Sequence, residues 1–399
     1  LSCEPSSVLK GVTLLPRQLE GIRKSWSMPG FAFFWVMGAG KTLSAISLAG
    51  LRNKYGLVHR LLVICPTSIK GVWAKEFARY ADFPHTLHVH ESGKPIPRGF
   101  SSAPFPVLVV GVEAMSVKSG PEVCKDFLSA GSSMAILDES SRIKHHNITR
   151  TQNILDLYQF AEYRLILTGT SITQGLQDLY TQMQFVDPRA IGEISYYSFK
   201  NKYCVMGGYK DKSIIGYTKT DVLLGKVRPF CDVVRKSDMK DLPVKSYQVR
   251  EVSASRQQKE ICKELKKNLK LIIGDKETSV KNVLEAMLRM QQVAGGFDGE
   301  GNPLAQNPKM AELIDLLEDF DGKAVIWSRF LPEIFAIRTS LEKAYPGSTM
   351  VMTGDTPQES RQQMVDEFQN NDSLRFFISN HAVGGAGITL TSPTMAVYY

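Results

Sequence analysis

The chain has 399 residues, of which 43% are hydrophobic and 22% are charged, and its formal net charge is +8. This composition predicts a globular protein of two or three domains and excludes a collagen, a disordered tail and a small disulfide scaffold. No apolar run approaches the roughly 18 residues that a membrane-spanning helix needs, so no membrane contact is expected. The six cysteines are scattered without a Cys-x-x-Cys pair, which predicts free thiols and a cytoplasmic location.

Short apolar runs separated by helical stretches predict buried parallel strands of doubly wound sheets. The first series lies at residues 31–36, 61–65, 107–110, 134–137 and 164–167. A second series lies at residues 324–327, 349–352, 375–378 and 396–399. We therefore expect an α/β protein with two sheet-containing units, at residues 1–187 and 308–399.

The segment between these units, residues 188–307, has a different pattern. Residues 204–218 carry two consecutive glycines between two mixed runs, which predicts a β-hairpin. Residues 255–273 and 280–293 repeat apolar side chains at helical spacing, which predicts two amphipathic helices. This segment is expected to be an insert and linker rather than a third sheet.

The positive charge of the chain is concentrated in this insert. Between residues 189 and 245 there are 12 basic and 6 acidic residues, interleaved with aromatic side chains. Such a composition favours a surface that follows a phosphate backbone, with Lys200 and Lys202 as candidate DNA contacts. The alternative is a solvated insert whose tyrosines pack a small core of their own.

Three histidines, His85, His88 and His90, lie within six residues of one another. No cysteine or carboxylate nearby completes a ligand set, so a surface turn is favoured over a metal site.

Both ends of the chain have the features of a fragment boundary. The chain begins at Leu1 rather than Met, and it ends on the apolar run at residues 396–399. Such a strand needs further elements to cover it, so the natural protein is expected to continue past Tyr399.

A phosphate-binding loop is predicted at Gly38-Ala39-Gly40-Lys41-Thr42, between the first strand and an apolar-periodic helix. Glycines let backbone N–H groups approach phosphate oxygens, and the helix N-terminus adds positive potential. In this interpretation Lys41 reaches the β- and γ-phosphates of ATP, and Thr42 holds Mg²⁺. The full eight-residue pattern would have Gly where Trp35 stands, so a glycine turn capped into a helix is the alternative.

An acidic pair, Asp138-Glu139, follows the run at residues 134–137. The pair is therefore expected at the carboxyl edge of the sheet, where open α/β folds bind ligands. Asp138 would coordinate Mg²⁺, and Glu139 would orient and deprotonate the attacking water. The alternative is a helix N-terminus whose acidic residues complement the helix dipole.

Further motifs accompany Lys41 and Asp138 in chain order. They are Leu15-Pro16-Arg17-Gln18, Cys65-Pro66-Thr67-Ser68, Asp138 to Lys144, Leu167-Thr168-Gly169-Thr170, Val325 to Phe330 and Gly384 to Thr391. In this order they resemble the motifs of the Swi/Snf-type ATPases of helicase superfamily two. The resemblance covers nearly the whole chain, and the predicted hairpin at residues 203–217 is similar to that of compact phage and bacterial members.

The resemblance implies a role for each motif. Gln18 would read adenine, and Gly387 would complete the ATP site that begins at the phosphate-binding loop. Thr168, Gly169 and Thr170 would couple the ATP state to the DNA site. The implied DNA contacts are Pro66, Thr67, Ser68, Arg329, Gly384, Gly385 and Thr389.

The family implies two RecA-like lobes with the nucleotide in the cleft between them. The expected activity is that of an ATP-dependent translocase or remodeller, which moves along double-stranded DNA by alternating grips on the backbone. One alternative is a strand-separating helicase on single-stranded DNA or RNA. Another is a DNA-binding scaffold that uses ATP as a clamp without hydrolysis. In a phage or prokaryote the expected location is the nucleoid or the host cytoplasm.

The chain also departs from the pattern of the family. The family usually has an acidic residue near Trp35-Val36, His where Ser141 stands and Pro where Ser171 stands. The last arginine motif is missing, and an arginine finger contributes about 10³ to 10⁵ to the rate of related phosphoryl transfers. This chain by itself is therefore expected to bind ATP far better than it hydrolyses ATP.

Overall fold

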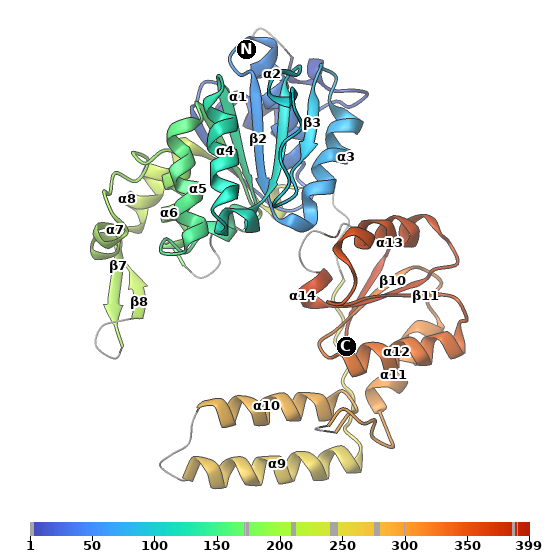
Figure 1. Ribbon diagram of the computed structural model, residues 1–399. Coiled ribbons are helices and arrows are strands. Elements are labelled where there is room, and N and C mark those ends of the chain that lie inside the picture. Colours follow the sequence, from blue (N-terminus) through green and yellow to red (C-terminus); the bar gives the residue numbers. More distant parts are fainter. Residues whose placement is uncertain are drawn as a thin grey trace. The chain divides into compact units, whose positions relative to one another are not determined.

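The computed structural model describes residues 4–170, 172, 175–208, 213–239, 246–274, 280–298, 300–384, 388 and 390–399. For residues 268–274, 280–282, 358, 382 and 384 only the backbone is described. The chain forms two compact units, Leu1–Pro243 and Val244–Tyr399 (Figure 1).

The first unit is built on a seven-stranded sheet in the order β3-β4-β2-β5-β6-β1-β9, and every neighbouring pair is parallel. The strands are β1 (Gly30–Trp35), β2 (Arg60–Cys65), β3 (Thr86–Val89), β4 (Pro106–Gly111), β5 (Ser133–Asp138), β6 (Tyr163–Leu167) and β9 (Cys231–Val234). The five strands that the sequence predicts in this half of the chain are confirmed, and β3 and β9 are additional.

Helices cover both faces of this sheet and create two cores. The helices are α1 (Pro16–Ser25), α2 (Lys41–Lys54), α3 (Lys70–Tyr80), α4 (Ser119–Ser129), α5 (Thr149–Asp156), α6 (Asp178–Val186), α7 (Tyr196–Tyr203) and α8 (Thr220–Val227). The helices α1 to α3 pack into one core, to which β1 contributes Phe31, Phe33 and Trp35. The helices α4 to α8 pack into the other core, to which β1 contributes Ala32 and Phe34. Burial on both faces explains why the strands are continuous apolar runs.

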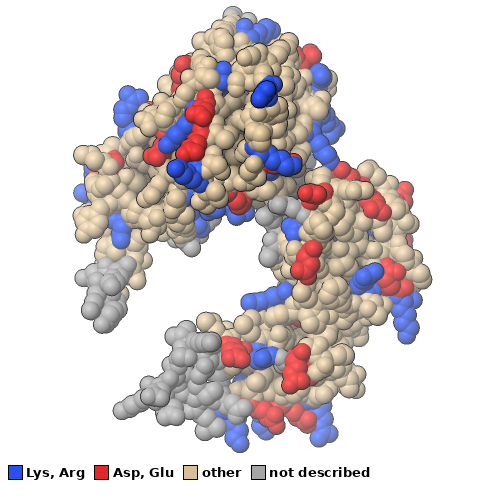
Figure 2. All heavy atoms as spheres, viewed as in Figure 1, with Lys and Arg blue, Asp and Glu red and all other residues tan. Residues whose placement is uncertain are grey.

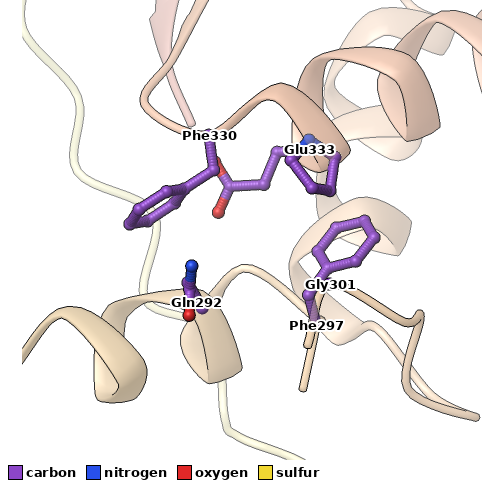
Figure 3. A pocket seen from close by; sticks show the side chains of 6 residues that line it. Gln292, Phe297, Gly301, Phe330 and Glu333 are labelled. Carbon is purple, nitrogen blue, oxygen red and sulfur yellow. The ribbon is translucent and has the colours of Figure 1, made fainter. Parts of the chain in front are cut away.

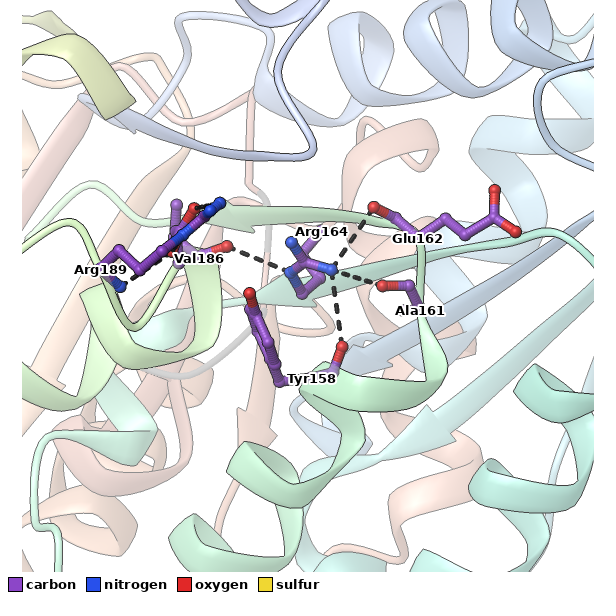
Figure 4. A network of polar contacts seen from close by, with 7 residues as sticks. Tyr158, Ala161, Glu162, Arg164, Val186 and Arg189 are labelled. Carbon is purple, nitrogen blue, oxygen red and sulfur yellow. Dashed lines mark hydrogen bonds and ion pairs between the residues drawn. The ribbon is translucent and has the colours of Figure 1, made fainter.

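A buried arginine fixes the chain around β6 (Figure 4). The Arg164 guanidinium donates hydrogen bonds to the backbone carbonyls of Val186 (3.1 Å), Tyr158 (3.5 Å), Glu162 (3.4 Å) and Ala161. The start of β6 is thereby tied to the end of α6, which brings the chain back over the sheet.

The division into units differs from the three parts that the sequence suggests. β9 pairs with β1, so a segment placed in the insert by sequence extends the first sheet. The helices α7 and α8 also pack into the core of α4 to α6. The contacts of the chain therefore divide it after Pro243, whereas the expected boundaries were 187/188 and 307/308.

The predicted β-hairpin is confirmed as β7 (Cys204–Gly207) paired antiparallel with β8 (Ser213–Tyr217). It follows directly on α7, whose Phe199 and Tyr203 are fully buried in the core of the first unit. Both aromatic side chains pack into the core of the first unit, whereas the alternative for the basic insert expects a small core of its own.

The second unit contains a four-stranded parallel sheet in the order β11-β12-β10-β13. Its strands are β10 (Ala324–Ser328), β11 (Thr349–Met352), β12 (Phe376–Asn380) and β13 (Met395–Tyr398), and all four were predicted from the sequence. Its helices are α11 (Pro308–Glu318), α12 (Leu331–Ala344), α13 (Gln358–Asn370) and α14 (His381–Gly384). The helices α11 and α12 pack on one face of the sheet, and α13 packs on the other.

Two antiparallel helices precede this sheet and form a helical hairpin, α9 (Arg256–Gly274) and α10 (Val280–Ala294) (Figure 1). The two amphipathic helices predicted for the insert are therefore confirmed. Together, the two parallel sheets confirm the expected α/β class with two sheet-containing units. Within the described residues, no helix combines the length and apolar character needed to cross a membrane.

The prediction of a surface turn around His85, His88 and His90 is wrong. His88 lies within β3, an edge strand paired with β4, and His90 follows it and is buried. In the described part of the chain, no group of three His, Cys, Asp or Glu side chains could hold a metal ion.

Candidate functional site

The predicted phosphate-binding loop joins the end of β1 to the start of α2, the position that the sequence predicts. Gly38 and Gly40 have φ angles of +82° and +81°, in the left-handed region that favours glycine. A Cβ atom on Gly40 would lie 2.0 Å from the Gln18 Nε2 atom, whereas one on Gly38 would meet nothing within 4 Å. The backbone above Gly38 is therefore open to an approaching group.

Lys41 is the first residue of α2 and its ammonium bends back towards the end of β1. The Nζ atom donates hydrogen bonds to the carbonyl oxygens of Trp35 (3.0 Å) and Val36 (3.5 Å). Burial lowers the pKa of Lys41, while the charges of Glu139 and Asp138 act in the opposite direction. The ammonium thus lies within electrostatic reach of both acidic residues.

The acidic pair stands where β5 ends, at the carboxyl edge of the sheet. One carboxylate oxygen of Asp138 accepts a hydrogen bond from Trp73 Nε1 (3.0 Å), and the other accepts one from the Glu139 amide (2.9 Å). Burial raises the pKa of Asp138 to about 6. Glu139 has a φ of +49°, a conformation that is uncommon for a residue other than glycine.

Gln18 of α1 is buried against the phosphate-binding loop. Its Nε2 atom donates to the Ala39 carbonyl (3.0 Å), and its Oε1 atom accepts from the Leu15 amide (2.8 Å). The structure therefore brings Gln18, Ala39, Gly40 and Lys41 together, although they come from two helices and a loop.

Trp35 connects several parts of the candidate nucleotide site. Its indole Nε1 donates to Asp232 Oδ2 (2.8 Å), and the other oxygen of Asp232 pairs with Lys24 (2.7 Å). Gly21 of α1 lies so close to the Trp35 ring that a Cβ atom there would be 2.3 Å from it. Val36, the next residue, donates its amide to the Val234 carbonyl of β9 (2.9 Å).

Asp232 was not singled out from the sequence. It lies 197 residues from Trp35, and no local motif marks it. The Asp232 carboxylate therefore contacts Trp35, near which the sequence lacks the acidic residue that is usual in the Swi/Snf-type family.

Thr168, Gly169 and Thr170 lie beside the phosphate-binding loop. A Cβ atom on Gly169 would be 3.4 Å from the Met37 amide nitrogen and 3.5 Å from the Trp35 carbonyl oxygen. The Thr168 amide donates a hydrogen bond to the Phe33 carbonyl. The Thr168 hydroxyl accepts a hydrogen bond from the Thr170 amide (3.1 Å). Ser171, one of the departures noted above, lies outside the described residues.

Pro66, Thr67 and Ser68 follow β2, which is next to β5 in the sheet. The Thr67 hydroxyl and amide both donate to Glu113 (2.5 and 3.1 Å). Burial opposes ionisation of Glu113, but the hydrogen bonds from Thr67 and backbone amides, with the charge of Arg142, outweigh it and lower its pKa. This motif leads into α3, whose Trp73 contacts Asp138.

The two lysines predicted to contact DNA in the first unit differ in their surroundings. Lys202 forms an ion pair with the buried Glu193 (2.6 Å), which also accepts from Ser198 (2.5 Å). For Lys200, no ion pair within 4 Å occurs among the described side chains. On the face seen in Figure 2, basic side chains lie interspersed with acidic ones.

The predicted site residues of the second unit are only partly described. Arg329 follows β10 and donates to the Gln291 side chain of α10 (2.6 Å). Gly384 is the last residue of α14. Gly385, Gly387 and Thr389 lie outside the described residues.

Comparison with known proteins places these features in a family. A model of the SNF2-related domain matches residues 28–295, which is more than half of the chain. The fold is similar to that of the SWI2/SNF2 ATPase core of Sulfolobus solfataricus, with a TM-score of 0.51 and 23% sequence identity. That match covers 99% of this chain and 83% of that one.

Alignments with curated relatives cover nearly the whole of this chain. A SWI/SNF-related matrix-associated actin-dependent regulator of chromatin subfamily A-like protein 1 homolog of Caenorhabditis elegans is 25% identical, covering 96% of this chain and 54% of that protein. The SWI/SNF chromatin-remodeling complex subunit snf22 of Schizosaccharomyces pombe is 26% identical, covering 99% of this chain and 25% of that protein. The chain thus spans between a quarter and about half of their length. On the match of the family model, the chain belongs to the SNF2-related domain family.

Proposed function

We propose that the protein is an ATP-dependent translocase on double-stranded DNA. The observation that carries the proposal is the position of Lys41 at the start of α2, directly after a glycine loop in left-handed conformation and within the electrostatic influence of Asp138 and Glu139 at the end of β5. A glycine turn, or a helix end with acidic residues, would not require a half-buried lysine that follows β1 to lie near two acidic residues at the end of β5. Phosphoryl transfer from ATP requires such a set.

The residues present fit ATP and Mg²⁺. Above Gly38 the loop is open, so backbone amides and Lys41 can receive the β- and γ-phosphates. The raised pKa of the buried Asp138 indicates a carboxylate whose charge is poorly compensated, which suits a cation ligand beside Thr42. Bound there, Mg²⁺ would neutralise charge on the phosphate oxygens. Glu139 would orient the attacking water and accept its proton.

Coupling to DNA would pass through the contacts around the loop. Gly169 lies against Trp35 and Met37, so a shift of the loop on hydrolysis would reach the motif of Thr168 to Thr170 directly. Pro66, Thr67, Ser68, Arg329, Gly384, Gly385 and Thr389 would hold the phosphate backbone without reading bases. The Sulfolobus structure with the similar fold is a complex with double-stranded DNA, which supports a duplex partner.

ATP hydrolysis by the full-length protein tests the proposal when it is measured without nucleic acid, with single strands and with duplex DNA. We expect stimulation by duplex DNA that is abolished by Lys41→Ala and by Glu139→Gln. The Glu139→Gln variant should still bind ATP, because Glu139 is not part of the phosphate-binding loop.

Two results would contradict this proposal. A preference for single strands would favour the strand-separating helicase. ATP binding without stimulation by any nucleic acid would favour the clamp. The placement among compact phage and bacterial members stays a prediction that this assay does not address.

A further inference from the structure

Four lysines form a row on one face of α9. Lys259, Lys263, Lys266 and Lys267 are spaced four, seven and eight residues from the first, which places them within about 100° of the helix circumference. All four are exposed, and with Cys262 they line a shallow groove. Glu260 and Glu264 lie on the strip beside this row. We call these four lysines the α9 lysine row.

The α9 lysine row has no acidic partners within the described structure. None of the four ammonium groups has a carboxylate within 4 Å among the described side chains, whereas the neighbouring Arg256 pairs with Glu260 (2.9 Å).

Three cations of the basic insert in the first unit have partners within the fold. Lys202 pairs with Glu193, Arg189 pairs with Asp187 (2.8 Å), and Lys226 donates to the Ile191 carbonyl (2.7 Å). These cations maintain the fold, while those of the α9 lysine row are available to an external anion.

The base of α9 is held firmly against α10. Ser255 and Gln258 exchange hydrogen bonds between side chain and backbone (2.8 and 3.2 Å), which caps the helix. The buried Gln258 amide also donates to the Val293 carbonyl near the end of α10 (2.8 Å). Lys259 is the next residue, so the row starts where the helix is anchored.

The end of α10 is in turn anchored to the second sheet (Figure 3). Glu333 of α12 is buried and accepts a hydrogen bond from Ser328 of β10, and a Cβ atom on Gly295 would lie 1.7 Å from its carboxylate. Asn307 donates to the Gly295 carbonyl (2.9 Å), and Arg329 donates to Gln291 of α10 (2.6 Å). The hairpin and the residue Arg329 therefore belong to one packed body.

We propose that the α9 lysine row binds the phosphate backbone of double-stranded DNA, as a contact separate from the motifs of the two sheets. The inference rests on the proposed function for its choice of partner. The row places four positive charges along about 12 Å of helix axis. Duplex DNA carries about one negative charge per 1.7 Å, so the charges can be matched without sequence preference. Anchoring to Arg329 would make this contact move with the second sheet.

The test is the salt dependence of duplex binding, measured by fluorescence anisotropy without nucleotide. The variant carries Gln at all four positions of the row, because Gln favours helix as Lys does and removes only charge. Each released phosphate contact contributes about 0.9 to the slope of log K against log salt. We expect the slope to fall by about 3 to 4 in magnitude.

A matched variant controls for the loss of net charge. It carries Gln at four exposed lysines on other elements, namely Lys10, Lys54, Lys118 and Lys343. We expect it to keep the slope of the unmodified protein within about 1.

Three results would overturn the inference. One is an unchanged slope in the row variant, and a second is an equal loss in both variants; either leaves the proposed function standing. The third is absence of duplex binding by the unmodified protein, which would overturn the proposed function as well.

Discussion

Asp232 contacts more of the proposed nucleotide site than its position in a short strand suggests. It accepts from the Trp35 indole and pairs with Lys24, and the Trp35 carbonyl accepts from Lys41. The same helix that carries Lys24 also carries Gln18, which contacts the loop at Ala39. One carboxylate therefore joins β9 and α1 to the strand that leads into the phosphate-binding loop.

Replacing Asp232 should separate its hydrogen bond from its charge. Asp232→Leu leaves the buried indole N–H without an acceptor, so the free energy of unfolding should fall by about 1 to 3 kcal/mol. Asp232→Asn keeps an acceptor for the indole and should lose less. The Leu variant should also bind ATP more weakly, because Trp35 positions Lys41. Urea unfolding and an ATP titration by fluorescence measure the two effects.

Helix α1 provides a control for this prediction. Lys24→Met removes the partner of Asp232, while Arg23→Met removes an exposed cation one residue earlier. Only the former should destabilise the protein. Equal stability of the Leu and Asn variants at position 232 would contradict the role of the indole hydrogen bond.

At the scale of single residues, the sequence could predict the features that lie within one contiguous motif. Gly38 to Thr42 and Asp138-Glu139 are contiguous patterns whose geometry follows from a strand that leads into a helix or loop. The pairing of Thr67 with Glu113 and of Trp35 with Asp232 spans 46 and 197 residues. Such contacts depend on which strands become neighbours, and no local pattern encodes that.

Helix α7 carries Lys202, which the sequence predicts to contact DNA. Glu193 is buried beneath this helix and accepts from both Ser198 and Lys202. The hydrogen bonds from Lys202 and then Ser198 lower the pKa of Glu193, despite its burial. The ionised carboxylate is therefore favoured by the folded state.

We expect Lys202→Met to lower the free energy of unfolding, and the matched Lys200→Met to leave it nearly unchanged. Because the pKa of Glu193 is lowered, its contribution is complete above the ordinary value of about 4.3 and is lost as the pH falls through the folded value. The stability gap between the unmodified protein and Glu193→Gln should thus be largest near pH 7 and close below about pH 4. A gap that widens in acid would contradict the assignment.

The strands missed by sequence have a common physical reason. β3 and β9 are four residues long, and each interrupts its apolar pattern with a polar side chain, His88 in one and Asp232 in the other. Their length and edge position do not explain the miss, because β11 and β13 are also four-residue edge strands and were predicted from less interrupted apolar runs. The long buried strands were predictable because a central parallel strand is apolar on both faces.

At the scale of the whole chain, the boundary between the units depends on β9. The strand begins 44 residues after the boundary expected from sequence at 187, yet it completes the first sheet beside β1. Ile191, Phe199, Tyr203 and Leu223, which also follow that boundary, are buried in the core of the first unit. The basic and aromatic composition of this segment did not predict the packing, because the same composition is also typical of an exposed surface.

A chain that ends at Pro243 should therefore unfold cooperatively in urea, whereas a chain that ends at residue 187 should not. The shorter chain loses β9, removes Phe199 from its contact with Tyr180 of α6, and leaves the Trp35 indole and the Val36 amide without their acceptors. Far-ultraviolet circular dichroism and tryptophan fluorescence should report one coincident transition for the longer chain. For the shorter chain we expect non-coincident transitions at lower urea. If both chains unfolded with the same midpoint and slope, residues 188–243 would add nothing to the stability of the first unit, as expected of an insert. Asp232 would then have no influence on the phosphate-binding loop.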